Sequence, residues 1–341
     1  MGRRVTQRDI AQLVGVSRST VSRVLNNDLE GGINIPAETR QRILAAARVL
    51  GYAPHAVARS LRSGLTSVIG ILIPDCRNPH FWAIFRGAEA AAREHGYHVL
   101  VTISNLELNR ERQCLEALAQ QRMDGLILVL THAVILAREL EDLRQQVGPI
   151  VTLHGSLPGK DALMHGYAEG MAQAMAHLLE LGHERIAFIH GVANPTLGTE
   201  RLGGYLKAMK EAGLPTPEEY VVQCGGTVEE GLEVARRLLD LQPRPTAIVG
   251  VNDLMAIATL QAAAERGLSV PGDLSVVGFD DIELAKYLVP PLTTVGIDAE
   301  LIGRQAVDLL FQRLVEPQRP AQTIVVPAHL IVRKSTGPCR S

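Results

Sequence analysis

Residues 6–26 read TQRDIAQLVGVSRSTVSRVLN, and the rest of the chain is best understood from this stretch. Thr6 and Asp9 have the spacing of a capping box, in which a hydroxyl and a carboxylate satisfy backbone N–H groups at the start of a helix. A helix is therefore expected to begin directly after Thr6. Gly15 then supplies the backbone freedom that a sharp turn needs, and Ser17 can cap a second helix.

The apolar residues of this stretch indicate two short helices that pack on each other. Ile10 and Leu13 form an apolar stripe on the first helix. The second helix carries Val21, Val24 and Leu25 on one side, and its remaining residues face outward: Arg18, Ser19, Ser22 and Arg23. Two helices joined by a short turn describe a helix-turn-helix, whose second helix can enter the DNA major groove. A surface hairpin with solvated arginines is the alternative.

Beyond these two helices, the sequence predicts a third helix that completes a small headpiece. Residues 26–36, NNDLEGGINIP, are polar and rich in glycine, so they are expected to form a loop. Pro36 suits the first turn of the third helix, and Gly51 ends it. The core face of this helix has the spacing i, i+4 and i+7: Ile43, Ala47 and Leu50.

The linker that follows, YAPHAVARSLRSGLTS (residues 52–67), contains a short candidate helix. Pro54 can begin it and Gly64 breaks it after only about two turns, a length that is marginal for an isolated helix in water. It could fold against its twin in a dimer on DNA, where Leu61 would wedge between base pairs from the minor groove. A flexible hinge is the alternative that the spacing leaves open.

Charge is divided unevenly along the chain. Residues 1–66 contain ten arginines against four acidic residues, a net charge of +6, so the remainder carries −8 of the total of −2. A basic end on an acidic body is typical of a protein that binds a polyanion through one end.

Length and composition predict a globular protein of more than one domain. The chain has 341 residues, of which 46% are hydrophobic and 21% charged, and it is too long for one ordinary core. It has no apolar run of about 18 residues, which a membrane helix needs. The first residues, MGRRVTQRD, have no apolar segment after their arginines, so no secretory signal and a cytoplasmic location are expected.

From residue 67 onward the pattern alternates between strands and helices. Continuous apolar runs fit buried parallel strands at residues 68–74, 97–103, 125–130, 149–153, 185–190, 246–250 and 274–279. Helical segments separate them, including residues 80–95, 110–122, 170–183 and 253–267. About 270 residues of this pattern exceed one doubly wound domain. We therefore expect an α/β core of parallel sheets in two lobes, with a cleft between them.

Ligands in such sheets bind beyond the carboxyl ends of the strands. That rule selects five loops: PDCRNPHFW (74–82), HGSLPGK (154–160), HGVANPTLGTER (190–201), VNDL (251–254) and FDDIE (279–283). Their polar side chains are candidates to line the cleft.

With these motifs in place, the chain resembles the LacI/GalR family of bacterial transcription regulators over essentially its whole length. The motifs that carry the resemblance are TQRDIAQLVGVSRSTVSRVLN, LGYAPHAVARSL, IGILIPDCRNPHF, LELGHERIAFIHG, ERLGGYLKAM, NDLMAIATLQAAAERGLSVPGDLSVVGFDD and VPPLTTV. The resemblance implies a DNA-binding headpiece (1–51), a hinge helix (52–66) and a two-lobed core (67–341) like the type I periplasmic sugar-binding proteins. It also implies a homodimer that binds a near-palindromic operator.

By position, the resemblance assigns DNA contacts to residues of the headpiece and the hinge. The residues that match base contacts are Arg18, Ser19 and Arg23. Those that match phosphate or positioning contacts are Thr6, Ser17, Thr20, Ser22 and Asn26. Leu61 matches the intercalating hinge leucine, with Ala58 beside it. Arginine can bond the two acceptors of guanine at once, so a preference of Arg18 or Arg23 for G is chemically reasonable.

The resemblance also assigns effector contacts in the cleft. Arg201, Asn252 and Asp280 fall where sugar-binding relatives contact their ligands, and their side chains can bond neighbouring hydroxyls. Phe81 and Trp82 could stack on an apolar ligand face. Structural roles are the alternative, such as Asp280 capping a helix or Arg201 holding a loop.

The chain departs from the family pattern mainly in the pocket. His154 and His165 stand where many relatives have Asp, and Gly226 stands where several have a stacking ring. His80 and His154 join the candidate effector contacts. Together with His190 these histidines suggest metal, phosphate or an acidic effector, but they show no HxH or HExxH pairing. We therefore expect no metal and no cofactor.

The sequence features bear on three classes of function. A ligand-responsive repressor is expected, with a sugar or sugar derivative bound between the lobes; whether the effector weakens or tightens DNA binding stays open. A solute-binding protein would share the core but would need a signal peptide and would have no use for residues 1–66. An enzyme is not expected, because the chain lacks GxGxxG after a strand, the P-loop spacing and GxSxG. No membrane partner is expected, and the final residues, RKSTGPCRS, lack heptads, so a dimer is the expected assembly.

Overall fold

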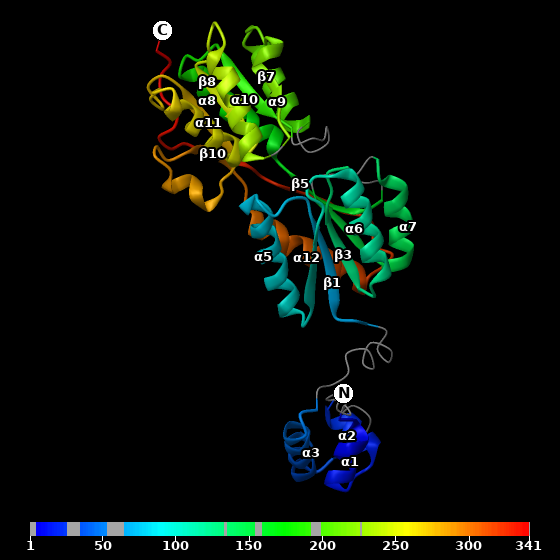
Figure 1. The fold of residues 1–341 in the computed structure, drawn as a ribbon. Helices are drawn as coiled ribbons and strands as arrows, with labels where there is room; N and C mark the ends of the chain where they lie inside the picture. The colour runs from blue at the N-terminus through cyan, green and yellow to red at the C-terminus, as the bar shows by residue number, and fades with distance from the viewer. Residues whose placement is uncertain are drawn as a thin grey trace. The chain divides into compact units, whose positions relative to one another are not determined.

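The computed structural model describes residues 5–25, 35–52, 65–132, 135–153, 159–191, 199–225 and 227–340. The chain forms two compact units, residues 1–66 and 67–341 (Figure 1). Seven of the residues discussed above lie outside the described ranges: Asn26, Pro54, Ala58, Leu61, Gly64, His154 and Gly226. The predicted hinge helix lies outside them as well.

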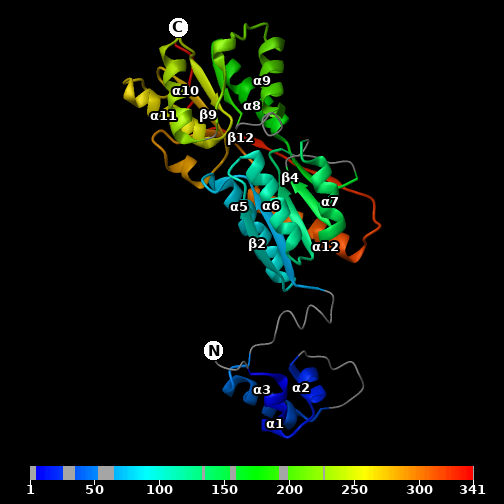
Figure 2. The same ribbon diagram turned by 45° about the vertical axis from the view of Figure 1, so that its right-hand side comes forward.

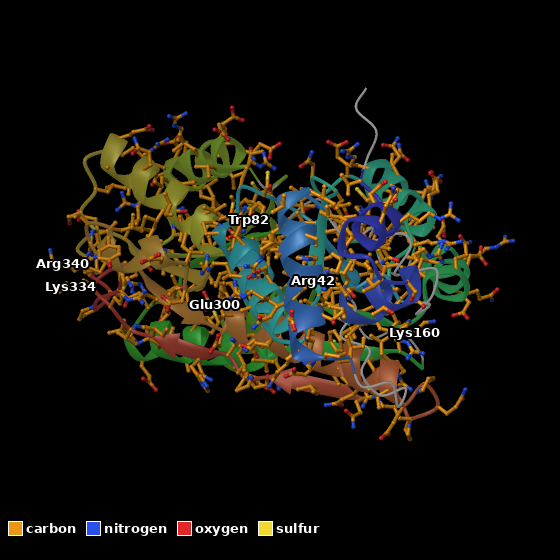
Figure 3. The ribbon with its side chains drawn as sticks, turned by 90° about the horizontal axis from the view of Figure 1, so that it is seen from below. Arg42, Trp82, Lys160, Glu300, Lys334 and Arg340 are labelled. Carbon is orange, nitrogen blue, oxygen red and sulfur yellow. The ribbon has the colours of Figure 1, made fainter. Side chains whose placement is uncertain are left out.

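The described part of the first unit contains three helices around a small core of its own. They are α1 (Gln7–Val14), α2 (Arg18–Leu25) and α3 (Ala37–Val49). Its buried residues are Ile10, Ala11, Val14, Val21, Val24, Ile43, Ala46 and Ala47. Arg42 of α3, labelled in Figure 3, donates a hydrogen bond of 2.9 Å to the carbonyl of Val14 and so ties α3 to the end of α1. The predicted helix-turn-helix is confirmed.

The capping of these helices follows the sequence prediction. The carboxylate of Asp9 accepts hydrogen bonds from the N–H and the hydroxyl of Thr6, at 2.7 and 2.8 Å. The hydroxyl of Ser17 accepts from the N–H of Thr20 at 3.1 Å. Gly15 ends α1 in the left-handed conformation, with φ of 75°.

One headpiece prediction was wrong. Leu13 does not belong to the apolar stripe, because 59% of its surface is exposed. At about 100° per residue, Ile10, Ala11 and Val14 share one face of α1, and Leu13 falls to the side of it. A spacing of three residues from Ile10 is therefore not sufficient to bury this leucine.

The described part of the second unit contains two six-stranded sheets. The first has the order β11-β5-β4-β3-β1-β2 and is parallel throughout. Its strands are β1 (Val68–Ile73), β2 (His98–Ile103), β3 (Gly125–Val129), β4 (Ile150–Leu153), β5 (Asp161–His165) and β11 (Thr323–Val326). Because both of its faces are covered, central strands such as β1 and β3 are almost entirely apolar and buried.

The second sheet has the order β12-β10-β9-β8-β6-β7 and is parallel except for β12. Its strands are β6 (Ile186–His190), β7 (Val221–Gln223), β8 (Ala247–Gly250), β9 (Ser275–Asp280), β10 (Thr293–Gly296) and β12 (His329–Ile331). The seven predicted strands are all present. The prediction missed five of the strands that the structure describes: β5, β7, β10, β11 and β12.

Each sheet and its helices form one lobe (Figures 1 and 2). The first lobe contains α5 (Pro79–Glu94), α6 (Leu108–Gln120), α7 (Ala137–Val147) and α12 (Ala299–Val315). The second contains α8 (Tyr167–Glu180), α9 (Thr199–Glu211), α10 (Val228–Asp240) and α11 (Asp253–Glu265). The described chain passes between the lobes after β5, after β10 and after β11. The predicted two-lobed α/β core is confirmed.

Helices α5 and α12 pack with their backbones in direct contact. A Cβ atom on Gly87 would lie 2.0 Å from the carbonyl oxygen of Glu300, and one on Gly303 would lie 2.0 Å from that of Ile84. Only glycine leaves room for this approach. The pair fixes α12 in the first lobe, although it follows the second lobe in the sequence.

No helix of the described chain is both long and apolar enough to cross a membrane.

Candidate DNA-binding surface and ligand site

Helix α2 and the residue before it carry most of the described residues predicted to contact DNA. Arg18 and Ser19 are exposed, and Thr20, Ser22 and Arg23 are half-buried. The hydroxyl of Ser17 lies 2.6 Å from that of Ser19 and 2.8 Å from that of Thr20, so three hydroxyls meet at the first turn. This turn carries no acidic residue. A positive helix end that carries hydroxyls and arginine but no acidic residue is suited to phosphate and base-edge contacts.

Thr6 occupies the equivalent place at the start of α1. It is exposed, and its hydroxyl and N–H are both bonded to Asp9. The structure therefore brings Thr6, Ser17, Arg18, Ser19 and Thr20 to the beginnings of two neighbouring helices, and Arg23 lies in the last turn of α2.

A second group of predicted residues is buried in the core, at the carboxyl ends of both sheets. The predicted effector contacts in the described ranges are no more than 9% exposed: His80, Phe81, Arg201, Asn252 and Asp280. His165, at the end of β5, is 3% exposed. Burial of so many polar side chains costs free energy unless they form hydrogen bonds with each other or with a ligand.

Asp280 of the second lobe meets two groups from the first lobe. The side-chain amide of Asn78 donates to its Oδ2 at 3.1 Å, and Nδ1 of His80 lies 3.9 Å from its Oδ1. Asn78 also caps α5, because its Oδ1 accepts from the N–H of His80 at 3.0 Å. Asn78 was not among the predicted site residues, although its place before Pro79 marks it as a helix cap.

The backbone at Asp280 is held in an unusual conformation. Asp280 has φ of 100° and Asp281 has φ of 51°, a region that residues other than glycine rarely adopt. The carboxylate of Asp253 accepts from the N–H of Ile282 at 2.8 Å and from the hydroxyl of Thr294 at 2.5 Å. Burial, with the nearby charge of Asp280, raises the pKa of Asp253 well above its usual value. These contacts fix the loop that aims Asp280 at the other lobe.

Arg201 is held between two aromatic rings. Its guanidinium carbon lies 4.0 Å from the ring centre of Tyr167 and 5.4 Å from that of Phe279. Its Nη1 donates to the carbonyl of Val251. Cation–π contacts and a backbone bond thus set its orientation. Neither Tyr167 nor Phe279 was singled out from the sequence, and Tyr167 follows a strand that the apolar pattern missed.

The histidine rings form an edge-to-face chain with Tyr167. The rings of His80 and His165 are 6.1 Å apart, and those of His165 and Tyr167 are 5.0 Å apart. Burial lowers the pKa of His80; the negative charge of Asp280 raises it, and the positive charge of Arg201 lowers it further. Burial also lowers the pKa of His165 far below its usual value, helped by His80 and Arg201. Both imidazoles are neutral at pH 7, so each offers one donor and one acceptor.

Other predicted residues have structural contacts. Oδ1 of Asn252 accepts from the N–H of Met255 at 3.0 Å and caps α11. Trp82 donates its indole N–H to the carbonyl of Cys76 at 2.8 Å. His190 stacks on Phe188 with ring centres 5.9 Å apart. Among the residues that the structure describes, no group of three or more His, Cys, Asp and Glu side chains is arranged to hold a metal ion.

Comparisons with known proteins cover both units. A profile described as bacterial regulatory proteins, lacI family, matches residues 6–55, and one described as a periplasmic binding protein-like domain matches residues 175–336. The ribose operon repressor of Escherichia coli (strain K12) is 36% identical over 331 residues, which cover 97% of this chain and 99% of that protein.

Solved structures agree with these matches. The lac repressor dimer bound to operator and the anti-inducer ONPF has a TM-score of 0.86 and 28% identity, covering 98% of this chain and 100% of that one. The complex of the transcriptional regulator CelR with cellobiose has a TM-score of 0.72 and 30% identity, covering 97% and 100%. The matched proteins are regulators and not enzymes. A helix-turn-helix headpiece, a two-lobed core and a curated relative matched along nearly the full length identify this chain as a member of the lacI family of bacterial regulatory proteins.

Proposed function

We propose that the protein is a transcriptional repressor that binds a near-palindromic operator as a homodimer and responds to a sugar or sugar derivative held between its lobes. The headpiece comprises residues 1–51, the hinge 52–66 and the core 67–341. An operator-binding role places the protein in the bacterial cytoplasm, where the chromosome lies. The observation that carries the proposal is the pairing of an exposed, arginine-bearing helix start with a buried polar cluster that links two lobes.

The DNA contacts are proposed from the placement of these residues on α2 and at the start of α1. Arg18 and Arg23 would read base edges in the major groove, where arginine bonds guanine bidentately, with Ser19 beside them. The hydroxyls and the helix end would bond phosphates: Thr6, Ser17, Thr20 and Ser22. Three further contacts are proposed on the family resemblance alone. Asn26 would contact a phosphate, and Leu61, with Ala58 beside it, would wedge into the minor groove.

The ligand class follows from the protonation of the cleft. His80 and His165 are neutral, Tyr167 keeps its proton because burial raises its pKa, and the charge of Arg201 is engaged by two rings and a carbonyl. Such a set favours an uncharged ligand with many hydroxyls over a dianion. The ribose operon repressor and the cellobiose complex of CelR are consistent with a sugar.

The response mechanism follows from the contact between Asn78 and Asp280. This hydrogen bond joins the two lobes directly, at 3.1 Å. A sugar hydroxyl that bonds Asp280 would compete with Asn78, so the ligand would favour a different arrangement of the lobes. Its effect on operator affinity can be no larger than its differential affinity for the two arrangements.

The test is operator binding by fluorescence anisotropy, with a duplex selected by the full chain from a random pool. The logarithm of the affinity for the duplex is expected to fall linearly with the logarithm of the salt concentration, because phosphate contacts release counterions from DNA. Ribose and cellobiose are the first ligands to add, followed by other sugars. Asp280→Ala should abolish the ligand response, and the variant should still bind the operator.

The matched control is Asp308→Ala, which removes an exposed carboxylate from α12 of the same core. It should leave both the ligand response and the operator affinity unchanged. A normal ligand response in the Asp280 variant would move the ligand site elsewhere, and salt-independent DNA binding would refute the proposed operator contacts.

A further inference from the structure

The second lobe has a pocket of about 500 Å³ at the end opposite to the ligand cluster. Its lining includes Arg185, Thr246 and Leu274, each directly before a strand of the second sheet: β6, β8 and β9. Asp280 lies at the other end of β9. At about 3.3 Å per residue, the six residues of β9 separate the pocket from the ligand cluster by roughly 20 Å.

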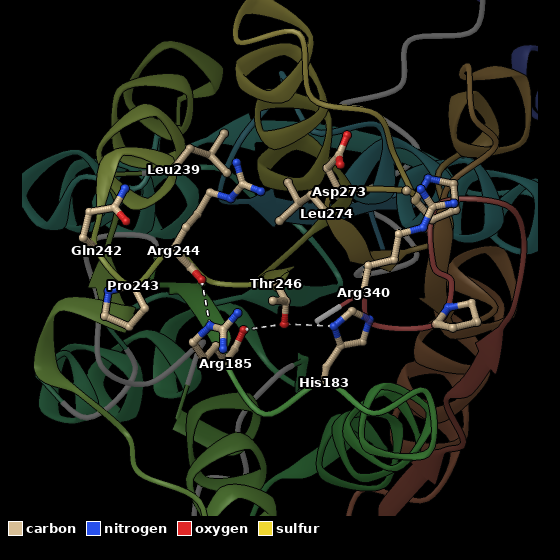
Figure 4. A pocket seen from close by; sticks show the side chains of 13 residues that line it. His183, Arg185, Leu239, Gln242, Pro243, Arg244, Thr246, Asp273, Leu274 and Arg340 are labelled. Atoms are coloured by element: carbon tan, nitrogen blue, oxygen red, sulfur yellow. Dashed lines mark hydrogen bonds between the residues drawn. The ribbon is translucent and has the colours of Figure 1, made fainter.

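Positive charge dominates this pocket. Among its described lining residues are three arginines from three separate segments, Arg185, Arg244 and Arg340, against a single carboxylate, Asp273. Figure 4 shows the three side chains arranged around the hollow. Oδ2 of Asp273 already accepts from the N–H and the hydroxyl of Ser269, at 2.8 and 2.7 Å. The lining therefore carries an excess of two positive charges that the acid does not balance.

Hydrogen bonds to backbone carbonyls hold the arginine segments in place. Nε of Arg185 donates to the carbonyl of Arg244 at 3.0 Å, which ties two of them together (Figure 4). The N–H of Cys339, next to Arg340, donates to the carbonyl of Leu181 at 2.8 Å. Nη1 of Arg340 would lie 3.8 Å from a Cβ on Gly272, so its guanidinium borders the pocket wall. The arrangement is thus part of the fold.

The floor of the pocket is neutral and well ordered by hydrogen bonds. His183 is 2% exposed, with Nε2 3.0 Å from the carbonyl of Gly337 and Nδ1 3.0 Å from the hydroxyl of Thr246. A carbonyl can only accept, so Nε2 carries the proton. The hydroxyl of Thr246 lies between Nδ1 and the carbonyl of Arg185, to which it donates at 3.3 Å. Burial lowers the pKa of His183, which keeps it neutral. Arginines around a neutral polar floor form a site for an anion of matching size.

We propose that this pocket binds a small phosphorylated metabolite, at a second site separate from the sugar site. Arginine forks match phosphate oxygens bidentately, and two or three of them can neutralise a phosphate dianion. The volume lies within the range of ordinary small-molecule sites and is larger than a bare phosphate requires. Arg244 and Arg340 approach from different segments and bind the phosphate, and the His183 and Thr246 floor borders the organic part.

The experiment is isothermal titration calorimetry of the full chain with inorganic pyrophosphate and with ribose 5-phosphate. Saturable binding of both probes is expected. In the double variant Arg244→Gln/Arg340→Gln, the affinity for both should fall at least tenfold. Arg244→Lys, which keeps the charge and loses the fork, should give an intermediate loss.

Two controls separate this site from the sugar site and from general charge effects. Lys207→Gln removes an exposed positive charge from α9 of the same lobe and should leave both affinities unchanged. Asp280→Ala should also leave them unchanged, whatever it does to the sugar response. Absence of binding, equal affinity in the double variant, or loss of binding in the Asp280 variant would overturn the proposal. Melting temperatures without probe confirm that each variant is folded.

Discussion

The headpiece and the core place their functional side chains in opposite environments. Arg18 and Ser19 at the start of α2 are exposed, over a core of a few small apolar residues. His80, Arg201 and Asp280 are buried in the core. Asp280 accepts a hydrogen bond from Asn78 of the other lobe, and Arg201 lies over the ring of Tyr167. We therefore expect that an exposed headpiece side chain can be removed without loss of folding, whereas removal of a buried cleft side chain also lowers the stability of the core.

Two glycines show the same contrast in the backbone. Gly15 of the headpiece has φ of 75° and open space around it, so it is needed for its conformation. Gly87 of the core has an ordinary backbone but no room for a Cβ atom, because the carbonyl of Glu300 lies against it. The headpiece therefore depends on local geometry and the core on close packing between distant segments.

The largest effect is expected from Gly87→Ala. Its Cβ would lie 2.0 Å from a backbone oxygen of α12, so the two helices must separate. We expect a loss of about 3 kcal/mol or more in core stability, at the upper end for overpacked sites. Chemical denaturation followed by circular dichroism measures it. The control is Gly203→Ala, since a Cβ there meets nothing within 4 Å; equal stability of the two variants would contradict the close-packing account.

The next effect is expected from Arg18→Ala. Loss of a bidentate base contact should cost about 2 kcal/mol, or roughly 30-fold, in operator affinity. Because the side chain is exposed, the melting temperature should not change. Anisotropy titration and calorimetry check the two parts. Arg93→Ala, an exposed arginine of the core, serves as the control; an operator affinity within twofold of wild type would exclude Arg18 from base recognition.

A smaller effect is expected when the pH falls below about 6.5, the usual pKa of histidine. The pKa values of His80 and His165 are lowered in the folded protein. As the pH falls, these histidines are therefore protonated in the unfolded chain before they are protonated in the folded one, and the stability of the core decreases. Each such histidine contributes up to about 1.4 kcal/mol per pH unit. Calorimetry between pH 7.5 and 5.5 should show a shallower slope for His165→Gln than for wild type.

The headpiece sharpens this test, because residues 1–54 contain no histidine. Its own unfolding should therefore be nearly independent of pH over the same window. A headpiece transition that shifts as much as that of the core, or an unchanged slope in His165→Gln, would show that other groups control the pH dependence.

The smallest effect is expected from Gly15→Ala. Alanine in the left-handed region costs about 1 kcal/mol, with no clash to add to it. The headpiece should lose that stability, and Gly15→Asn should lose less, because asparagine tolerates this region. Thermal unfolding of the headpiece measures both variants. A loss as large as that of Gly87→Ala would remove the contrast between the two glycines.

Sequence reasoning succeeded where the local pattern matches the final environment. The capping pairs Thr6 with Asp9 and Ser17 with Thr20 are local, so their spacing was sufficient. Central strands such as β1 are buried on both faces and appear as plain apolar runs. The rule that ligands bind beyond strand ends selected the loops that carry Asp280 and Arg201, and both side chains are buried there.

The pattern failed where burial depends on distant partners. Strand β5 begins with Asp161, which is buried against Arg313 at 2.9 Å and Arg319 at 3.1 Å, so it does not read as an apolar run. Missing β5 meant missing Tyr167, which follows it. Asn78 was missed for a similar reason, since its contact with Asp280 joins residues far apart in the chain.

The routing of the chain between the lobes also sets the order in which the protein can mature during synthesis. The first lobe needs α12 and β11, residues 299–326, so it stays unfinished until the ribosome has made nearly the whole polypeptide. The headpiece has all of its core residues by Ala47 and can fold as soon as it emerges. A nascent or prematurely terminated chain would thus have a folded headpiece, while the face of α5 around Gly87 would lack its partner α12. Degradation of incomplete chains is therefore important for a regulator with this chain order.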